Sequence, residues 1–222
     1  MNIFKHNWPA IIYFNFRMLP LKQACHLPFD IYHSVKFINL KGKIIIKSSQ
    51  IKTGMIKIGA QGSDMFATSS YIIDIKGQLV FNGKCSIGCN GLMRIEKEGT
   101  IIIGNNVTIG AKNTIFCEKA IYIGEDTISS WDCQIMDTDT HSILDTKTNN
   151  VSIRHKDVKI GKRNWIGNHV IINKGTQTSN ETIIASCSLC NKDYTNIEEF
   201  SIIGGYPAKL ISNNKTRYKD KI

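Results

Sequence analysis

A histidine preceded by two aspartates is the group of residues in this 222-residue chain that is best suited to chemistry. The three occupy alternate positions, Asp137, Asp139 and His141. The ordinary pKa of histidine lies near neutrality, so an imidazole can take a proton from a substrate and return it at little cost. Residues two apart in an extended chain face the same way, so Asp139 can hold the imidazole tautomer or accept a hydrogen bond from a substrate. The spacing leaves both roles open, with ordinary turn chemistry as the alternative for each aspartate.

His141 lies where a regular repeat breaks off. Ile123, Ser129 and Ile135 follow one another at intervals of six residues, and His141 takes the next place in that count. The segment that follows, Ser142 to Asp157, is polar, has no sixfold count and is long for a plain connection, which is typical of a functional loop. We therefore expect a protruding loop near 142–157. The alternative is that His141 is merely a solvated loop residue.

The sixfold repeat is clearest from Val158 to Cys190, and no amphipathic helix or ordinary strand has this period. Its repeating positions are Ile160, Ile166, Ile172, Thr178, Ile184 and Cys190, and each is followed by a small or turn-forming residue. Such a hexad suits a short strand with its aliphatic residue inward, followed by a corner where the small residue lets the backbone turn. Three hexads close a triangular coil of about 18 residues, so Ile166 should stack over Ile184.

This stretch resembles the hexapeptide-repeat acyltransferases, and three motifs strengthen the resemblance. Residues 137–141 are similar to the D-x-D-x-H of sugar O-acetyltransferases in that family, residues 164–168 to its N-x-W-I-G stretch, and residues 205–211 to its closing G-x-P-A-K-x-I motif. The resemblance implies an all-β, left-handed parallel β-helix, a handedness that the spacing does not show. We predict one domain over residues 1–222, with an N-terminal cap (1–43), coils (44–204) and a C-terminal tail (205–222).

The resemblance also implies roles for single residues. His141 would be the catalytic base that takes the proton of a sugar hydroxyl, and Asp139 would assist it. Asp137 and Trp131 would lie on the acceptor side. The residues on the side of the donor, acetyl-CoA, would be Trp165 beside the pantetheine arm, the backbone N–H of Gly167 or Asn168 facing the oxyanion, Ala185 in the groove and Lys209 near the 3′-phosphate. The chain has Ala185-Ser-Cys-Ser-Leu189 where the family usually has G-x-G-S-V, so this groove is bulkier.

The function that these motifs predict is O-acetyl transfer from acetyl-CoA to a sugar or glycan hydroxyl, in capsular or surface polysaccharide synthesis. The family assembles as a homotrimer with the donor between neighbouring subunits, a natural closed arrangement for such a subunit. One alternative is N-acyl transfer to an amino sugar or nucleotide sugar, which needs the same base and groove. Another is a β-helix kept as a non-catalytic binding module. No metal is expected, because the histidines form no close pair.

The amino-acid composition indicates which kinds of partner and which cellular compartment to expect. Lysine and arginine exceed aspartate and glutamate by ten, which favours an anionic partner. No basic run is interleaved with aromatic residues, so nucleic acid is not expected. Seven cysteines, an odd number without the spacing of a disulfide scaffold, indicate reduced thiols and a cytoplasmic protein. Cys187 and Cys190 form a C-x-x-C, but Cys190 falls on an inward position, which favours packing over metal binding.

The N-terminal segment differs from the rest of the chain. Residues 1–38 hold three of the four prolines and show no sixfold count, while Trp8 to Tyr32 is rich in apolar residues. We expect this segment to cover the open edge of the first coil. Contact with lipid headgroups at the inner face of the membrane, aided by Lys5, Arg17 and Lys22, is the alternative. The loop from Gly59 to Ser70 is expected to be a surface connection.

Overall fold

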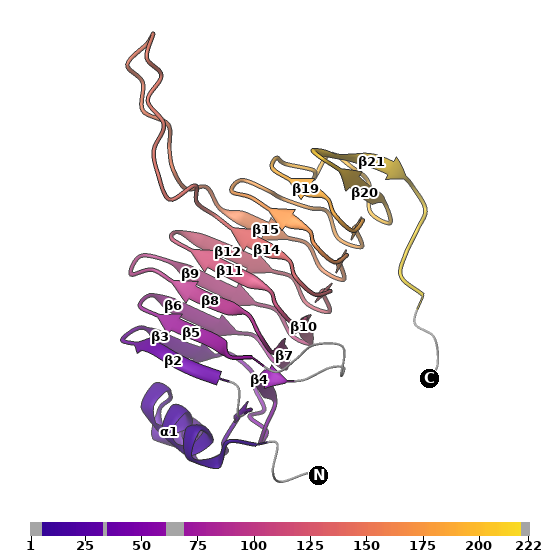
Figure 1. The fold of residues 1–222 in the computed structure, drawn as a ribbon. Coiled ribbons are helices and arrows are strands. Elements are labelled where there is room, and N and C mark those ends of the chain that lie inside the picture. Colours follow the sequence, from indigo (N-terminus) through magenta and orange to yellow (C-terminus); the bar gives the residue numbers. More distant parts are fainter. Residues whose placement is uncertain (1–5, 33–34, 61–68, 219–222) are drawn as a thin grey trace.

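The chain folds as a left-handed parallel β-helix, a triangular prism of stacked coils (Figure 1). The computed structural model describes residues 6–32, 35–60 and 69–218. Within these residues the strands form three sheets, which we call the first, second and third faces of the prism. Neighbouring strands are parallel except for the final pair, which is antiparallel. The all-β, parallel helical fold expected from the sequence is thereby confirmed.

Each face collects one strand from each successive coil. The first face contains β1 (Phe29–Ile31), β4 (Ile56–Ala60), β7 (Cys85–Gly88), β10 (Val107–Ile109), β13 (Ile128–Ser129), β16 (Trp165–Ile166), β18 (Ile183–Ile184), β20 (Ile202–Gly205) and β21 (Ala208–Ser212). The second face contains β2 (Val35–Leu40), β5 (Tyr71–Ile75), β8 (Leu92–Ile95), β11 (Thr114–Cys117), β14 (Gln134–Met136), β17 (Ile171–Ile172) and β19 (Leu189–Cys190). The third face contains β3 (Lys43–Ile46), β6 (Gln78–Phe81), β9 (Thr100–Ile103), β12 (Ala120–Ile123) and β15 (Val158–Ile160).

The core is a column of aliphatic side chains along the axis of the prism. Ile166 stacks over Ile184, as the sixfold count predicts, and Ile172 stacks over Cys190. All four side chains are buried, so Cys190 is a packing residue, whereas Cys187 is exposed. Each coil therefore covers the apolar interior of its neighbour, and a fully buried aliphatic side chain contributes roughly 1.5–3 kcal/mol.

The corners turn at a position that the sequence count does not single out. Arg163, His169 and Cys187 each follow an inward residue by three positions and have a left-handed backbone, with φ of 53°, 56° and 58°. The small residue directly after the inward one meets a different constraint. A Cβ on Gly161 would lie 2.3 Å from the carbonyl oxygen of Ser179 in the next coil. Small residues are thus needed at this position because adjacent coils approach closely, and the expectation that they make the turn is corrected.

Two helices cover the first coil, as predicted. They are α1 (Trp8–Met18) and α2 (Leu21–Ala24). Phe14 is fully buried, stacks on Phe37 at 4.9 Å between ring centroids, and meets Phe29 edge-on at 5.0 Å. The buried Asn15 side chain donates to the carbonyl of Phe29 at 2.9 Å and accepts from its N–H at 3.0 Å. The coil strands begin at Phe29, inside the range 1–43 that the sequence assigns to the cap.

Among the described residues, no helix is long and apolar enough to cross a membrane. Most of the expected connection from Gly59 to Ser70 lies outside the described residues.

A long arm leaves the prism between β14 and β15 (Figure 1). Every side chain from His141 to Arg154 is exposed. The arm is a narrow hairpin, because Leu144 and Val151 form an antiparallel bridge and the N–H of Ser152 donates to the carbonyl of Ile143 at 2.8 Å. The protruding loop predicted near 142–157 is thereby confirmed.

Replacing Ile166 with alanine should test the stacking column. The Ile166→Ala change leaves a cavity between coils, so we expect the free energy of unfolding to fall by about 2–5 kcal/mol. Thermal and urea unfolding measure the change. Ile153→Ala on the exposed arm is the control, and its effect should stay within about 0.5 kcal/mol. Equal effects for the two variants would contradict the importance of the column.

Candidate active site

The predicted base lies at the root of the arm, at the corner between the second and third faces. We call this edge of the prism the arm corner; it contains the connections β2–β3, β5–β6, β8–β9, β11–β12 and β14–β15. The two sides of the arm pair there, since Thr138 bridges His155, the N–H of Asp139 donates to Arg154 at 2.8 Å and that of Lys156 donates to Asp137 at 2.8 Å. The root is therefore a fixed support from which the exposed part of the arm extends.

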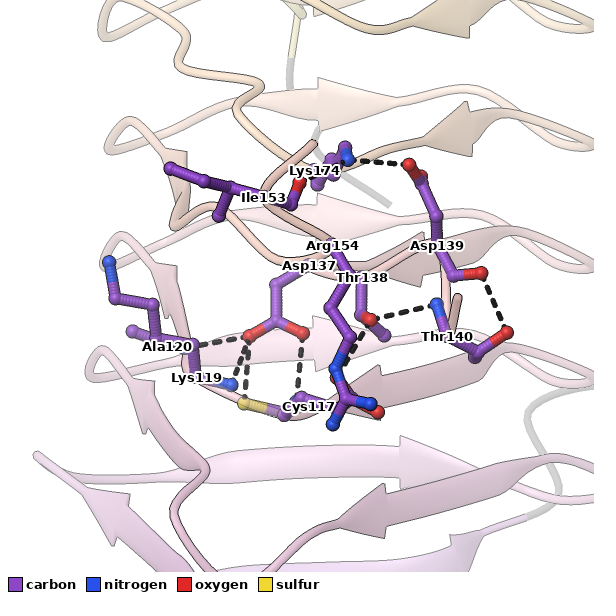
Figure 2. Close-up of polar contacts among 11 residues, drawn as sticks. Cys117, Lys119, Ala120, Asp137, Thr138, Asp139, Thr140, Ile153, Arg154 and Lys174 are labelled. Atoms are coloured by element: carbon purple, nitrogen blue, oxygen red, sulfur yellow. Dashed lines mark hydrogen bonds and ion pairs between the residues drawn. The ribbon is translucent and has the colours of Figure 1, made fainter. Parts of the chain in front are cut away.

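Asp137 anchors this root to the coil below (Figure 2). Its carboxylate is fully buried and accepts the backbone N–H groups of Glu118, Lys119 and Ala120 at 2.8, 2.7 and 2.7 Å. A buried carboxylate without such donors would be very costly. The interpretation of Asp137 as an acceptor-binding residue is therefore corrected, because both carboxylate oxygens face the protein interior.

Cys117 contacts the same carboxylate. Its thiol donates to Asp137 at 3.4 Å, and burial together with the nearby negative charge raises the pKa of Cys117. A raised pKa keeps the thiol protonated at neutral pH, and the thiolate is the nucleophilic form of cysteine. Cys117 is therefore unsuited to form an acyl-thioester, although it lies beside the root of the arm.

Asp139 faces a lysine from the coil above, Lys174 (Figure 2). Its carboxylate lies 2.5 Å from the Lys174 ammonium, which also donates to the carbonyl of Ile153 at 2.7 Å. The alternation expected for an extended chain fails at Thr140, whose φ of 63° places it in the left-handed region. This conformation is rare for a β-branched residue. The extended geometry that would place Asp139 and His141 on one side is therefore interrupted between them, and Asp139 pairs with lysine.

Three charged residues complete the root, and the local sequence around His141 contains none of them. Glu118 accepts from the Thr138 hydroxyl at 2.9 Å and from Arg154 at 3.0 Å, while Lys174 holds Asp139. They come from other coils or from the returning side of the arm. The stacking register is the signal that could have located Lys174, because Ile172 stacks on Ile135 two residues before Asp137.

A second histidine also lies at the root. His155 bridges Thr138, and its Nδ1 is buried with no hydrogen-bond partner in the described part of the chain. It stands beside the residues that lead to His141. Its position makes it a second candidate for a proton acceptor, which the sequence motif alone did not indicate.

The predicted donor-side residues gather at a different corner, between the first and second faces. We call it the tryptophan corner; it contains Trp131, residues 167–169 and residues 185–187. Trp165 lies just before it on β16, 38% exposed, between Ile128 and Ile183 of the adjacent coils. The Ser186 hydroxyl contacts the Asn168 side chain at 2.6 Å. The partly exposed Trp165 and the polar pair of Ser186 and Asn168 therefore adjoin.

The structure distinguishes the two candidate oxyanion donors. The N–H of Gly167 donates to the carbonyl of Ile184 at 2.8 Å, so it is committed to the coil ladder. The N–H of Asn168 has no hydrogen-bond partner among the described residues. Gly167 is thus corrected to a structural residue, and Asn168 remains the candidate.

The closing motif forms the antiparallel hairpin β20–β21 above this corner. Lys209 is exposed on β21 and pairs with Gly204. A Cβ on Gly204 would lie 2.8 Å from that of Ala185, so the hairpin packs directly on the bulkier residue of the groove. Lys209 thus lies on a hairpin that contacts Ala185, and its contact with the donor stays a prediction.

Within one chain the two halves of the predicted site are separated by the width of the second face. Trp131 and Asp137 lie at opposite ends of β14. The strand between them has three residues, and the chain turns at Asp132, whose φ is 59°. Asp139 and His141 thus lie at one corner, and Trp165, Asn168, Ala185 and Lys209 lie at or near another. Trp131 lies at the same corner as the predicted donor residues, away from the predicted base.

Replacing Asp137 with asparagine should separate a structural role from substrate contact. The amide NH₂ of Asp137→Asn would face backbone N–H donors, so at least one donor loses its acceptor and unfolding should become easier by about 1–3 kcal/mol. Thermal unfolding measures this change. Asp145→Asn, an exposed aspartate at the arm tip that accepts from Lys147 and Thr148, should shift the midpoint much less. Unchanged stability with weaker acceptor binding would restore the original interpretation of Asp137.

Comparison with known proteins gives acetyltransferases and an acyltransferase. No protein-family model matches the chain. It is 26% identical over 176 residues to a probable acetyltransferase of Mycobacterium tuberculosis, Rv3034c, an alignment that covers 76% of this chain and 53% of that protein. The chain thus spans about half the length of this curated relative.

Two solved structures have the same fold. The polySia-specific acetyltransferase NeuO superposes with a TM-score of 0.63 and 20% identity, over 87% of this chain and 80% of that chain. AntD, an N-acyltransferase from Bacillus cereus solved with dTDP and 3-hydroxybutyryl-CoA, superposes with a TM-score of 0.50 and 16% identity, over 97% and 92% of the two chains. The resemblance to the hexapeptide-repeat acyltransferases that the motifs indicate is thereby confirmed in the fold: this chain has the left-handed β-helix of that family.

Proposed function

We propose that this protein is an acetyltransferase that moves an acetyl group from acetyl-CoA to a hydroxyl of a sugar, in the synthesis of a surface or capsular polysaccharide. The observation that carries the proposal is an exposed histidine, His141, that follows a root anchored by Asp137 and by the Asp139–Lys174 pair. This arrangement stands on a fold that NeuO and AntD share. A catalytic base must be accessible to a large acceptor and must be held in position. The exposed start of the arm makes His141 accessible, and the anchored root fixes the residues directly before it.

His141 acts as general base in this proposal. Its imidazole takes the proton of the acceptor hydroxyl while that oxygen attacks the acetyl carbonyl, and the proton then passes to the departing sulfur. The negative charge that develops on the carbonyl oxygen is met by the N–H of Asn168. Lys174 keeps the Asp139 carboxylate engaged, which leaves the imidazole available to the substrate.

The residues of the tryptophan corner suit a coenzyme A thioester, which supplies the acetyl group in activated form. Trp165 offers a partly exposed aromatic surface, and Lys209 offers a positive charge for a phosphate. Asn168 offers an N–H that has no partner in the described part of the chain. Cys187 lies at the same corner and has a left-handed backbone, a conformation that favours glycine. Its side chain makes the entrance to the proposed donor groove narrower than a glycine at this position would. We infer that the donor lies along this corner.

A homotrimer would complete the site. One chain keeps the base and the donor wall on different corners, so a neighbouring subunit must bring the second half. Closed cyclic assemblies place the same two surfaces of adjacent subunits together at every interface. A threefold ring therefore creates three equivalent sites, each built from the arm corner of one subunit and the tryptophan corner of the next.

The N-terminal cap would add a weak contact with the membrane surface at its inner face. Ile12, Tyr13, Phe16 and Leu21 are exposed on the cap, with Arg17 beside them. Apolar and aromatic side chains next to basic ones favour the headgroup region of a bilayer. Such a contact would bring the site near a lipid-linked acceptor.

Replacing His141 with alanine tests the proposed chemistry. Release of free thiol from acetyl-CoA is measured over a panel of neutral, acidic and amino sugars and their polymers. His141→Ala should lower kcat by a factor of about 10²–10⁴ with the acceptor that the wild type uses. The His26→Ala variant, an exposed histidine near the N-terminal cap, should keep full activity.

The same panel separates the alternatives. Turnover with amino sugars alone would replace O-acetyl transfer by N-acyl transfer. Loss of activity in His155→Ala with His141→Ala unaffected would move the base to His155. Binding of acetyl-CoA without turnover on any acceptor would make the protein a binding module.

Mixing two inactive variants tests the shared site. His141→Ala lacks the base, and Trp165→Ala/Lys209→Glu lacks the donor wall, so each parent should be inactive. In mixed assemblies about a quarter of the interfaces should combine an intact arm corner with an intact tryptophan corner. Activity should return to about that fraction, with size-exclusion chromatography confirming that both variants assemble. No recovery in mixed assemblies would show that each site lies within one chain.

A further inference from the structure

Each of the five connections of the arm corner contains a lysine, and so do the segments after β17 and β19, which continue this edge beyond the arm. The connections follow the second-face strands in successive coils, and the lysines are Lys41, Lys76, Lys97, Lys119, Lys156, Lys174 and Lys192. Adjacent coils lie about 4.8 Å apart. The seven residues therefore form a column of positive charge along one edge of the prism, and the arm leaves the prism from within this column.

The column has two parts with different partners. At the arm root two of the lysines are paired, Lys119 with Asp157 at 2.8 Å and Lys174 with Asp139 at 2.5 Å. Toward the N-terminal end, Lys41 and Lys97 are exposed, and so is Lys43, which lies beside the column at the start of β3. None of these three has an ion pair with any described residue. The first set stabilises the arm, whereas the second leaves positive charge facing solvent.

The unpaired lysines line an open groove of 580 Å³. Its walls also include Lys76, which is paired with Glu96 at 2.9 Å, and the exposed Glu98. The four lysines outnumber these two carboxylates, so the groove has a net positive charge. Exposed charges of one sign in a concave surface favour an oppositely charged ligand.

The groove has a floor of glycine backbone. A Cβ on Gly42 would lie 2.2 Å from the carbonyl oxygen of Gly77, and one on Gly77 would lie 2.3 Å from that of Gly99. Side chains are excluded there, so the lysines stand at the sides of a trough that runs parallel to the prism axis. Its lining contains no aromatic and no aliphatic residue.

The trough is aligned with the root of the arm. Lys97 lies two coils below the root, about 10 Å away, and Lys41 four coils below, about 19 Å away. A polymer that follows the arm corner would therefore reach His141 at one end while its preceding residues lie between the lysines.

We propose that this trough, defined by Lys41, Lys43, Lys76 and Lys97, binds the chain of an anionic glycan whose reacting sugar lies at His141. The proposal rests on the proposed function, because it assigns the acceptor of that site to polymers that carry carboxylate or phosphate groups. Nucleic acid fits poorly, since the trough has no aromatic surface for base stacking. A membrane surface fits poorly as well, since no apolar side chain lines it. An extended, hydrated polyanion needs only regularly spaced cations.

The test compares two triple variants with equal changes of charge. Lys41→Gln/Lys43→Gln/Lys97→Gln removes the unpaired lysines of the trough. Lys52→Gln/Lys57→Gln/Lys84→Gln removes three exposed lysines from the first face and its corner with the third face, away from the arm. Binding of polysialic acid and polygalacturonate, with neutral dextran as reference, is measured without acetyl-CoA at two salt concentrations.

The trough variant should bind the anionic glycans roughly tenfold more weakly, since three exposed ion pairs are lost. The control variant should change far less, and wild-type affinity should fall with added salt. With the acceptor that the thiol-release panel identifies, the trough variant should raise KM for the polymer and leave kcat unchanged. A single sugar spans only the reactive end, so its KM should be unaffected.

Several results would overturn the inference. Equal losses in the two variants would indicate diffuse attraction by net charge, and binding only to phosphatidylglycerol vesicles would indicate a membrane surface. An unchanged polymer KM in an active trough variant would reject the trough and leave the transferase function intact. Conversely, glycan binding that the trough variant alone loses, in a protein that never releases thiol, would support the trough and reject the transferase. His141→Ala should retain glycan binding.

Discussion

The close stacking of one coil on the next is the constraint on which the rest of this structure depends. A parallel coil satisfies its backbone only through the coils above and below, and its apolar interior is buried only by them. The inward isoleucines fix the register, as in the Ile166–Ile184 pair, while glycines such as Gly161 let the coils approach. Corner side chains of successive coils are therefore spaced regularly along the prism axis. Residues that are far apart in sequence lie along the same edge.

The arm is an interruption of this stacking, and its root shows how the protein accommodates it. When the chain leaves the prism after β14, three backbone N–H groups of the preceding coil point to the buried carboxylate of Asp137. The carboxylate closes the corner, and the pairs Asp139–Lys174 and Arg154–Glu118 tie the arm to the coils above and below. Of the three residues that look catalytic in the sequence, Asp137 and Asp139 thus hold the arm in place, whereas His141 is exposed on it.

The same geometry relates the proposed chemistry to assembly and acceptor choice. Because each corner is a straight edge, the proposed base and the proposed donor wall lie on separate edges of one chain, which is why the proposed function includes a neighbouring subunit. Because the lysines share an edge with His141, the proposed anionic polymer would follow them toward that residue. Both proposals rest on a single property of the prism: the corner residues of successive coils form straight rows, and each row gathers residues that are far apart in sequence.

The amino-acid sequence by itself determined the β-helix, the inward register and the place of the arm, because a sixfold period is a local property of the chain. The position of Cys190 in the count identified it as a packing residue, whereas the antiparallel hairpin of β20 and β21 falls partly in the range that the sequence assigned to a C-terminal tail. Only the tertiary structure decided which polar groups are free. It showed that Asp137 and the Gly167 N–H are committed to neighbouring coils, that Thr140 breaks the alternation before His141, and that Lys174 pairs with Asp139. These facts depend on contacts between coils, where residues distant in sequence compete for the same hydrogen bonds, and a pattern read along one strand does not contain them.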